Sequence, residues 1–207
     1  MTQASLPLAQ RSRRGFAAFV EDAGNRAALR YVSDVTLWPS PVALLLGPAG
    51  SGKSHLGEAF AEPDRVFVDD ADAADEEDLF ARINRALAGE VEALLVASRL
   101  PPSEWDIAMP DLSSRLGNVP VLTLAEPGDA VLGEIVRRLF ADHGRAVDAE
   151  VVSYMLTRLP RSIADLAPVV DAIERAAQSE RADVTKRYVA RWLGRNDTAS
   201  PEPETAP

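Results

Sequence analysis

The chain has 207 residues, of which 46% are hydrophobic and 26% charged, a composition typical of a soluble globular protein with one or two domains. It contains no cysteine, which excludes disulfides and thiolate metal sites and favours a cytoplasmic location. Its net charge of −10 argues against stand-alone binding to DNA, which is a polyanion. No stretch reaches the ~20 apolar residues of a membrane span, and none has the pattern of a signal peptide.

In chain order, residues 1–15 show no helical or strand period, and we expect a flexible peptide there. Apolar spacing predicts a helix within 16–33 that begins near Gly24 or Asn25. Short apolar runs then predict strands at 42–46, 65–68, 92–98 and 119–124. Helical patterns lie between them at 53–61, 77–88 and 111–116. This alternation predicts an α/β domain over 16–126 with a mainly parallel sheet covered on both faces.

After Pro127 the strand patterns stop, and residues 127–194 predict a small all-α domain. Helices are expected at 129–143, 148–158, 162–179 and 185–193, with N-caps at Asp129, Asp148, Ser162 and Thr185. Pro168 lies inside the third pattern, so that helix is expected to kink or to begin late. The Pro-rich and acidic residues 195–207 are expected to form a disordered tail.

The strongest motif is GPAGSGKS, which fits the phosphate-binding pattern G-x-x-x-x-G-K-[ST] between a predicted strand and a predicted helix. Its residues are Gly47, Pro48, Ala49, Gly50, Ser51, Gly52, Lys53 and Ser54, followed by His55. The glycines let main-chain N–H groups point at phosphate oxygens, and the following helix adds its positive end. Lys53 supplies a cation for the outer phosphates, and the Ser54 hydroxyl can bind Mg²⁺. The expected cofactors are ADP or ATP with Mg²⁺.

Two aspartates follow the next predicted strand, in the sequence RVFVDDAD. Asp69 can hold the magnesium shell together with Ser54, and Asp70 can orient a water molecule for hydrolysis. Many ATPases carry a glutamate at the second position, and the shorter reach of Asp70 predicts weak hydrolysis, or none, by this chain itself. The alternative is an ordinary acidic loop after a strand.

The order of the motifs GPAGSGKSHL, VFVDDAD, LLVASRLPP, PDLSSRL and LPRSIADL resembles the AAA+ ATPases of the DnaA branch, in particular the short Hda-type regulators of alphaproteobacteria. The resemblance covers residues 3–193. It implies an AAA+ P-loop NTPase fold followed by a helical lid domain. The family usually has a further strand at the sheet edge, between the phosphate-loop helix and the aspartates. Only HLGEAFAEPD separates Ser54 from RVFV here, so we expect that edge strand to be missing.

The resemblance also assigns roles to single residues. Ser98 falls in the sensor-1 region, and Arg115 matches the arginine finger, which acts on nucleotide held by a neighbouring subunit. Arg161 matches the sensor-2 arginine of the lid. An ordinary surface charge is the alternative for both arginines. The residues that fall where the family surrounds the adenosine are Asn25, His55 and Leu56. A helix cap and core packing explain these three equally well.

The N-terminal stretch QASLPL resembles the clamp-binding peptide of Hda-type proteins. The matching residues are Gln3, Ser5, Leu6, Pro7 and Leu8. Burial of the two leucines in an apolar cleft would dock the chain on the β sliding clamp of DNA polymerase III. The alternative is an unstructured terminus that matches by accident.

Together these features predict regulatory inactivation of the replication initiator DnaA. A clamp-tethered module would promote hydrolysis of the ATP bound to DnaA and so repress re-initiation, and it could also self-associate into a homo-oligomer. No basic helix-turn-helix follows the predicted lid, so we expect no direct sequence-specific DNA binding. A helicase-loader-like ATPase and a P-loop small-molecule kinase are the alternatives.

Overall fold

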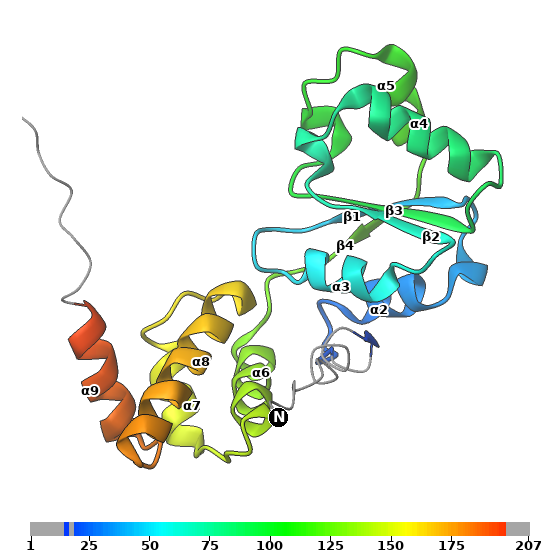
Figure 1. Cartoon of the computed structure of the whole chain (residues 1–207). Coiled ribbons are helices and arrows are strands. Elements are labelled where there is room, and N and C mark those ends of the chain that lie inside the picture. Colours follow the sequence, from blue (N-terminus) through cyan, green and yellow to red (C-terminus); the bar gives the residue numbers. More distant parts are fainter. Residues whose placement is uncertain (1–14, 17–18, 198–207) are drawn as a thin grey trace, which may run out of the picture. The chain divides into compact units, whose positions relative to one another are not determined.

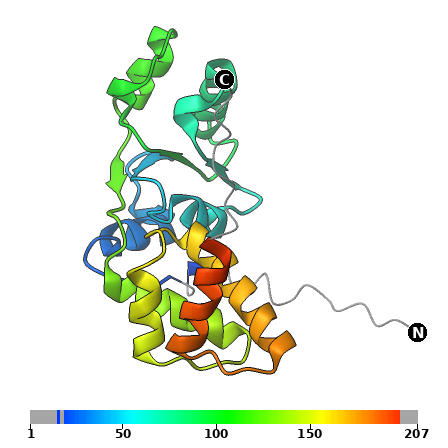
Figure 2. The ribbon, with the colours of Figure 1, turned by 90° about the vertical axis from the view of Figure 1, so that its left-hand side faces the viewer.

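The computed structural model describes residues 15–16 and 19–197. The chain divides into two compact units, Met1–Glu126 and Pro127–Pro207. The first is built of strands and helices, and the second is helical (Figures 1 and 2). Within the described ranges, no helix is both long and apolar enough to cross a membrane.

The first unit alternates strands with helices, as the sequence predicts. Its main elements are α2 (Arg26–Ser33), β1 (Val42–Leu46), α3 (Lys53–Phe60), β2 (Arg65–Val68), α4 (Glu76–Leu87), β3 (Ala93–Ser98), α5 (Pro110–Leu116) and β4 (Val121–Thr123). Among the described residues the strands form one parallel sheet in the order β2-β3-β1-β4. No strand lies between α3 and β2 in this part of the chain, so β2 is an edge strand, as the short spacing predicts.

The two central strands, β1 and β3, are buried on both faces because their side chains alternate between two apolar layers. The side chains that pack toward α4 and α5 are Val42, Leu44, Leu94 and Val96. Those that pack toward α2 and α3 are Ala43, Leu45, Ala93, Leu95 and Ala97. Figure 1 shows the two helix pairs on opposite sides of the sheet. The layering explains why both strand sequences are apolar at nearly every position.

A tight turn shortens the exposed sheet edge at β2. Glu62 and Arg65 exchange two main-chain hydrogen bonds, of 3.1 and 3.0 Å, so both main-chain polar groups of Arg65 are used at the start of the strand. The Arg65 guanidinium also binds the Glu92 carboxylate at 2.7 Å. Short, charged edges leave little main chain for a foreign strand to pair with.

The second unit packs its helices around one apolar core. Its helices are α6 (Asp129–Asp142), α7 (Ala149–Leu156), α8 (Ile163–Glu180) and α9 (Lys186–Asp197), drawn from yellow-green to red in Figure 2. Side chains of every one of these helices meet there, including Phe140, Met155, Ile173 and Val189. α8 begins at Ile163 and runs through Pro168, so this helix does not begin late.

The predicted N-caps of this unit differ in what their side chains do. The Thr185 hydroxyl accepts a hydrogen bond from the main-chain N–H of Tyr188 at 3.2 Å, as a capping residue does. Asp148 and Ser162 occupy the N-cap positions of α7 and α8, but neither side chain makes a capping hydrogen bond. The sequence therefore predicts which residue occupies the N-cap position better than it predicts whether that side chain makes a capping hydrogen bond.

Candidate nucleotide site

The phosphate motif forms a loop at the carboxyl end of β1 and leads into α3 at Lys53. Gly50 and Gly52 have φ angles of 75° and 96°, in the left-handed region that side chains with a Cβ rarely adopt. Gly47 is needed for space instead, because a Cβ there would lie 2.6 Å from the carbonyl oxygen of Leu124. The glycines of the motif thus permit a loop that closes tightly on itself.

Lys53 is buried within this loop, with 6% of its surface exposed. Its Nζ donates hydrogen bonds to the carbonyl oxygens of Gly47 at 2.7 Å and Pro48 at 3.0 Å. Burial lowers the pKa of Lys53, and the charges of Asp69 and Asp70 oppose that shift. A cation held inside a glycine-rich loop at the start of a helix suits a polyphosphate.

Two serine hydroxyl groups belong to this candidate site, one in the loop and one on the helix that follows it. Ser51 Oγ is buried and has no hydrogen-bond partner among the described residues. An unpartnered buried hydroxyl is unfavourable, so a ligand that supplied an acceptor would stabilise this loop. Ser54 is exposed on the first turn of α3, where its hydroxyl can bind a cation. The residues present therefore fit a nucleotide with Mg²⁺.

Asp69 and Asp70 follow β2. Because the strands are parallel, these aspartates lie at the same end of the sheet as the phosphate loop, where the strands have their carboxyl ends. The Asp69 carboxylate is partly buried and accepts a hydrogen bond from the main-chain N–H of Asp70 at 3.0 Å. Asp70 is exposed and has a φ of 43°, which is uncommon for a residue with a Cβ. The charges of both aspartates raise the pKa of Lys53 against the effect of its burial, and their roles toward magnesium and water stay predictions.

The end of β3 lies directly beside the loop. The carbonyl oxygen of Ser98 accepts a hydrogen bond from the Gly47 N–H at 3.3 Å. The Ser98 hydroxyl is fully buried, donates to the Leu100 carbonyl at 2.9 Å and accepts from the Leu100 N–H at 3.1 Å. Ser98 is therefore in the expected region, but its hydroxyl is used within its own turn.

Arg99 lies beside the aspartates of the candidate site and is not among the residues that the sequence predicts for it. Its guanidinium Nη2 lies 3.8 Å from Asp70 Oδ1, and its charge contributes to lowering the pKa of Lys53. The signal for it is its position directly after the apolar run that predicts the strand at 92–98.

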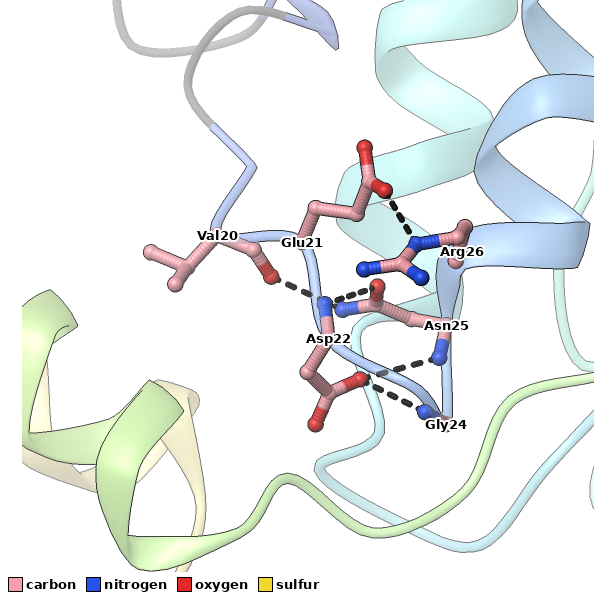
Figure 3. A network of polar contacts seen from close by, with 6 residues as sticks. All are labelled: Val20, Glu21, Asp22, Gly24, Asn25 and Arg26. Atoms are coloured by element: carbon pink, nitrogen blue, oxygen red, sulfur yellow. Dashed lines mark hydrogen bonds and ion pairs between the residues drawn. The ribbon is translucent and has the colours of Figure 1, made fainter.

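Asn25 holds together the turn that precedes α2 (Figure 3). Its Oδ1 accepts a hydrogen bond from the Asp22 N–H at 2.9 Å, and its Nδ2 donates to the Val20 carbonyl at 2.9 Å. The Asp22 carboxylate accepts from the N–H groups of Gly24 and Asn25, at 2.9 and 3.0 Å. The side-chain amide therefore organises residues 20–25, and contact between Asn25 and adenosine stays a prediction.

The other two residues predicted to surround adenosine differ in exposure. Leu56 is fully buried in the core, whereas His55 is partly buried, and its ring lies against Phe19 with centroids 4.6 Å apart. Phe19 also lies 3.7 Å from where a Cβ of Gly52 would be. Phe19, which is not among the predicted site residues, thus lies beside the phosphate loop.

Arg115 lies exposed on α5, on the side of the sheet covered by α4 (Figure 1). Its guanidinium carbon is 5.2 Å from the centre of the Phe80 ring, a cation–π contact. The segment before α5 is held by Glu76, whose two carboxylate oxygens each accept a main-chain hydrogen bond of 2.8 Å, from Ala108 and Met109. The Phe80 ring and the segment bonded to Glu76 therefore hold Arg115 in place at the surface. Its action on a neighbour's nucleotide stays a prediction.

Arg161 belongs to the second unit, where its guanidinium pairs with the Asp129 carboxylate. The prediction that Asp129 caps α6 is wrong, because Gly128 occupies the N-cap position and Asp129 is the first helical residue. A carboxylate there remains favourable because it lies near the positive end of the helix. The role of Arg161 toward a nucleotide stays a prediction, and the predicted clamp-binding residues 3–8 lie outside the described ranges.

Comparison with known proteins identifies the fold. No family model matches the chain. An uncharacterized protein of Haemophilus influenzae is 23% identical over 188 residues, which are 74% of this chain and 81% of that protein. Domain III of the replication initiation protein DnaA from Thermotoga maritima has a TM-score of 0.73 at 17% identity, over 91% of this chain and 98% of that one. The chain has the AAA+ fold.

Two further structures agree with this fold. DnaA from Aquifex aeolicus, solved with AMPPCP bound, has a TM-score of 0.63 at 18% identity, over 82% of this chain and 70% of that chain. A variant of RuvB from Thermotoga maritima has a TM-score of 0.63 at 13% identity, over 86% of this chain and 70% of that chain. The predicted class, a parallel sheet with flanking helices and a helical second unit, is confirmed. At these identities the likeness extends to the fold alone.

Proposed function

We propose that this chain is a nucleotide-binding AAA+ module that regulates replication initiation by acting on DnaA. The observation that carries the proposal is Lys53, buried in a glycine loop of a fold that DnaA shares. In this proposal Lys53 and the loop N–H groups hold the phosphates of ADP or ATP. Ser54 and Asp69 hold Mg²⁺, which neutralises phosphate charge when bound. AMPPCP in the Aquifex aeolicus DnaA structure supports this ligand class.

Arg115 is the proposed means of acting on DnaA. It is exposed, and its contact with Phe80 restrains the guanidinium before any partner arrives. A restrained guanidinium loses less conformational freedom on binding phosphate, which favours transition-state stabilisation in a neighbouring site. Hydrolysis of the chain's own nucleotide is slow in this proposal, because Asp70 is short and faces Arg99.

The proposed tether to DNA is the peptide QASLPL at residues 3–8, bound to the β sliding clamp of DNA polymerase III. Such a tether places the module near DNA without an extensive basic surface, which is compatible with the net charge of −10. The proposal places the protein in the cytoplasm, where this replication machinery works.

The decisive experiment follows hydrolysis of radiolabelled ATP on DnaA in the presence of clamp loaded on DNA. The wild-type chain should accelerate this hydrolysis, and Arg115→Ala should reduce the acceleration at least ~10-fold. Arg82→Ala, which removes an exposed arginine from α4, is the matched control and should retain it. Undiminished acceleration by Arg115→Ala would remove the mechanism.

Two binding measurements complete the test. Calorimetry should show that the wild-type chain binds the clamp and that Gln3→Ala/Leu6→Ala does not. Binding of single-stranded DNA by the chain alone, followed by anisotropy at moderate salt, would instead favour a helicase-loader-like ATPase.

A further inference from the structure

We propose that helix α9, labelled in Figure 1, carries a contact site for the phosphate backbone of duplex DNA. The site is a row of three arginines, Arg187, Arg191 and Arg195, which follow one another at about one helical turn. Contacts with phosphates position a protein on DNA and carry no sequence information. The inference rests on the proposed function only for the tether that brings duplex DNA near the module.

The first support is the separation of charge along the chain. The whole chain has a net charge of −10, yet residues 186–195 carry four cationic side chains and no acidic one. A cluster of one sign creates its own local potential, even on a molecule whose net charge has the other sign. The outer face of α9 is therefore a place where a polyanion can approach an acidic protein.

The second support is that the row faces outward. Tyr188 and Val189 are buried in the core of the second unit and hold the inner side of α9. The three arginines of the row are exposed. Residues spaced four apart lie on one side of a helix, and eight residues of helix measure about 12 Å. Phosphates of one DNA strand follow at about 3.4 Å along the axis, so the row is long enough for about three of them.

The third support is the way in which one carboxylate holds two of the arginines. Glu180 Oε2 lies 2.9 Å from Arg191 Nη2, and Glu180 Oε1 lies 3.3 Å from Arg195 Nη2. The Arg191 guanidinium carbon also lies 5.0 Å from the centre of the Tyr188 ring. One carboxylate shared by two guanidinium groups leaves the group positive and uses only a few of their N–H donors. The guanidinium groups are thus restrained before DNA arrives and keep donors for phosphate oxygens.

The composition of the row favours phosphate in a duplex as its partner. All three residues are arginines, and a planar guanidinium binds phosphate through two parallel donors, which an ammonium cannot do. A duplex presents its phosphates as a continuous line of high charge density, and it releases more counterions per contact than a single strand does. We therefore infer a duplex, and not a single strand or an acidic protein, as the partner.

The row is too small to hold DNA unaided at ordinary salt concentrations. Three phosphate contacts correspond to a slope of about −2.7 in log affinity against log salt, so a fourfold rise in salt should weaken binding about 40-fold. A tether compensates for such weakness, because it makes the second contact intramolecular and raises the effective concentration. The row would act where the clamp has brought the module to DNA, and it would orient the second unit there.

The test measures binding of the full chain to a fluorescent duplex by anisotropy at low salt, without the clamp. The wild-type chain should bind with a salt slope of about −2.7. Arg187→Gln/Arg195→Gln should weaken binding at least ~10-fold and bring the slope to about −0.9. Arg187→Lys/Arg195→Lys should keep the slope, because both charges remain.

The matched control is Arg82→Gln/Lys186→Gln, which makes the same change in net charge away from the row. Lys186 lies at the start of α9 and pairs with Glu150 at 2.7 Å, and Arg82 lies on α4. This control should bind the duplex as the wild-type chain does. Arg187→Gln alone leaves both pairs of Glu180 intact, so it tests the row without disturbing the helix packing, and it should reduce the slope by about 0.9.

The outcomes separate the inference from the proposed function. No duplex binding by the wild-type chain at low salt, or equal weakening in the row variant and its control, overturns the inference. Polyglutamate that binds as tightly as the duplex also overturns it and favours an acidic protein partner. A chain that binds the duplex through the row but does not bind the clamp overturns the proposed tether, while the contact with DNA stands.

Discussion

The ring of Phe67 in β2 lies directly against Gly57 in α3. A Cβ on Gly57 would stand 2.1 Å from the ring atoms, far inside contact distance. β2 is the edge strand, so no further strand of the described sheet holds its outer side. The contact between ring and glycine therefore fastens the strand that leads to Asp69 against the helix that begins at Lys53.

Gly57→Ala should destabilise the first unit, because neither the ring nor the helix backbone can move away without cost. We expect the free energy of unfolding to fall by about 1–3 kcal/mol in urea denaturation. Gly117→Ala is the matched control, since a Cβ there meets no atom closer than 3.4 Å. If Gly57→Ala/Phe67→Leu were no more stable than Gly57→Ala, the contact would not be the cause.

Glu76→Gln should loosen the segment that leads to Arg115. An amide has only one acceptor oxygen, so one of the two main-chain N–H groups, of Ala108 or Met109, loses its partner. We expect hydrogen exchange of these two amides to become at least ~10-fold faster, which corresponds to ~1.4 kcal/mol of local stability.

Glu77→Gln controls for the loss of a negative charge in the first turn of α4. Equal acceleration of exchange in the two variants would mean that helix electrostatics, and not the paired acceptor, holds the segment.

Arg145→Ala should destabilise the second unit strongly. Glu174 is buried, its Oε2 accepts a hydrogen bond from Arg145 Nε at 3.1 Å, and its Oε1 lies 2.9 Å from the same atom. Removing the arginine leaves a buried carboxylate without its partner, which typically costs about 3–5 kcal/mol. Thermal unfolding followed by circular dichroism measures the loss.

The matched double variant is Arg145→Met/Glu174→Leu, which replaces the pair with apolar side chains of similar size. It should recover most of the stability, because no charge is left buried. A double variant as unstable as Arg145→Ala would show that the arginine acts through its bond to the Ala182 carbonyl instead.

Tyr31→Phe should stabilise the first unit, most of all in alkali. The Tyr31 hydroxyl is buried without a partner among the described residues, and burial raises its pKa above the usual 10.0. Above pH 10 the unfolded chain loses this proton while the folded chain keeps it, so stability falls as the pH rises toward the folded pKa. Urea denaturation at pH 7 and above pH 10 should show a larger gain from Tyr31→Phe in alkali. A gain that does not grow with pH would contradict the raised pKa.

Local sequence determined the framework of this protein. The apolar runs VALLL and EALLVAS predict strands at 42–46 and 92–98, and strands buried on both faces form at Val42–Leu46 and Ala93–Ser98. The phosphate loop follows from its glycines, because left-handed φ angles at positions 50 and 52 restrict the residue type. The missing edge strand follows from spacing, since ten residues are too few for another strand and helix. These features depend on residues that are close together in the sequence, so the pattern of residue types along the chain predicts them.

Only the tertiary structure decided which polar groups meet. The Ser98 hydroxyl is used by Leu100, which leaves Arg99 to face Asp70, 29 positions earlier in the chain. Asp129, predicted as a helix cap, pairs instead with Arg161. The sequence alone offers each of these side chains several possible partners. The parallel sheet and the helix packing bring one of these partners close enough for a contact. Apolar periodicity predicts an element because burial acts on whole faces, whereas a polar contact depends on two atoms that folding brings together from distant positions.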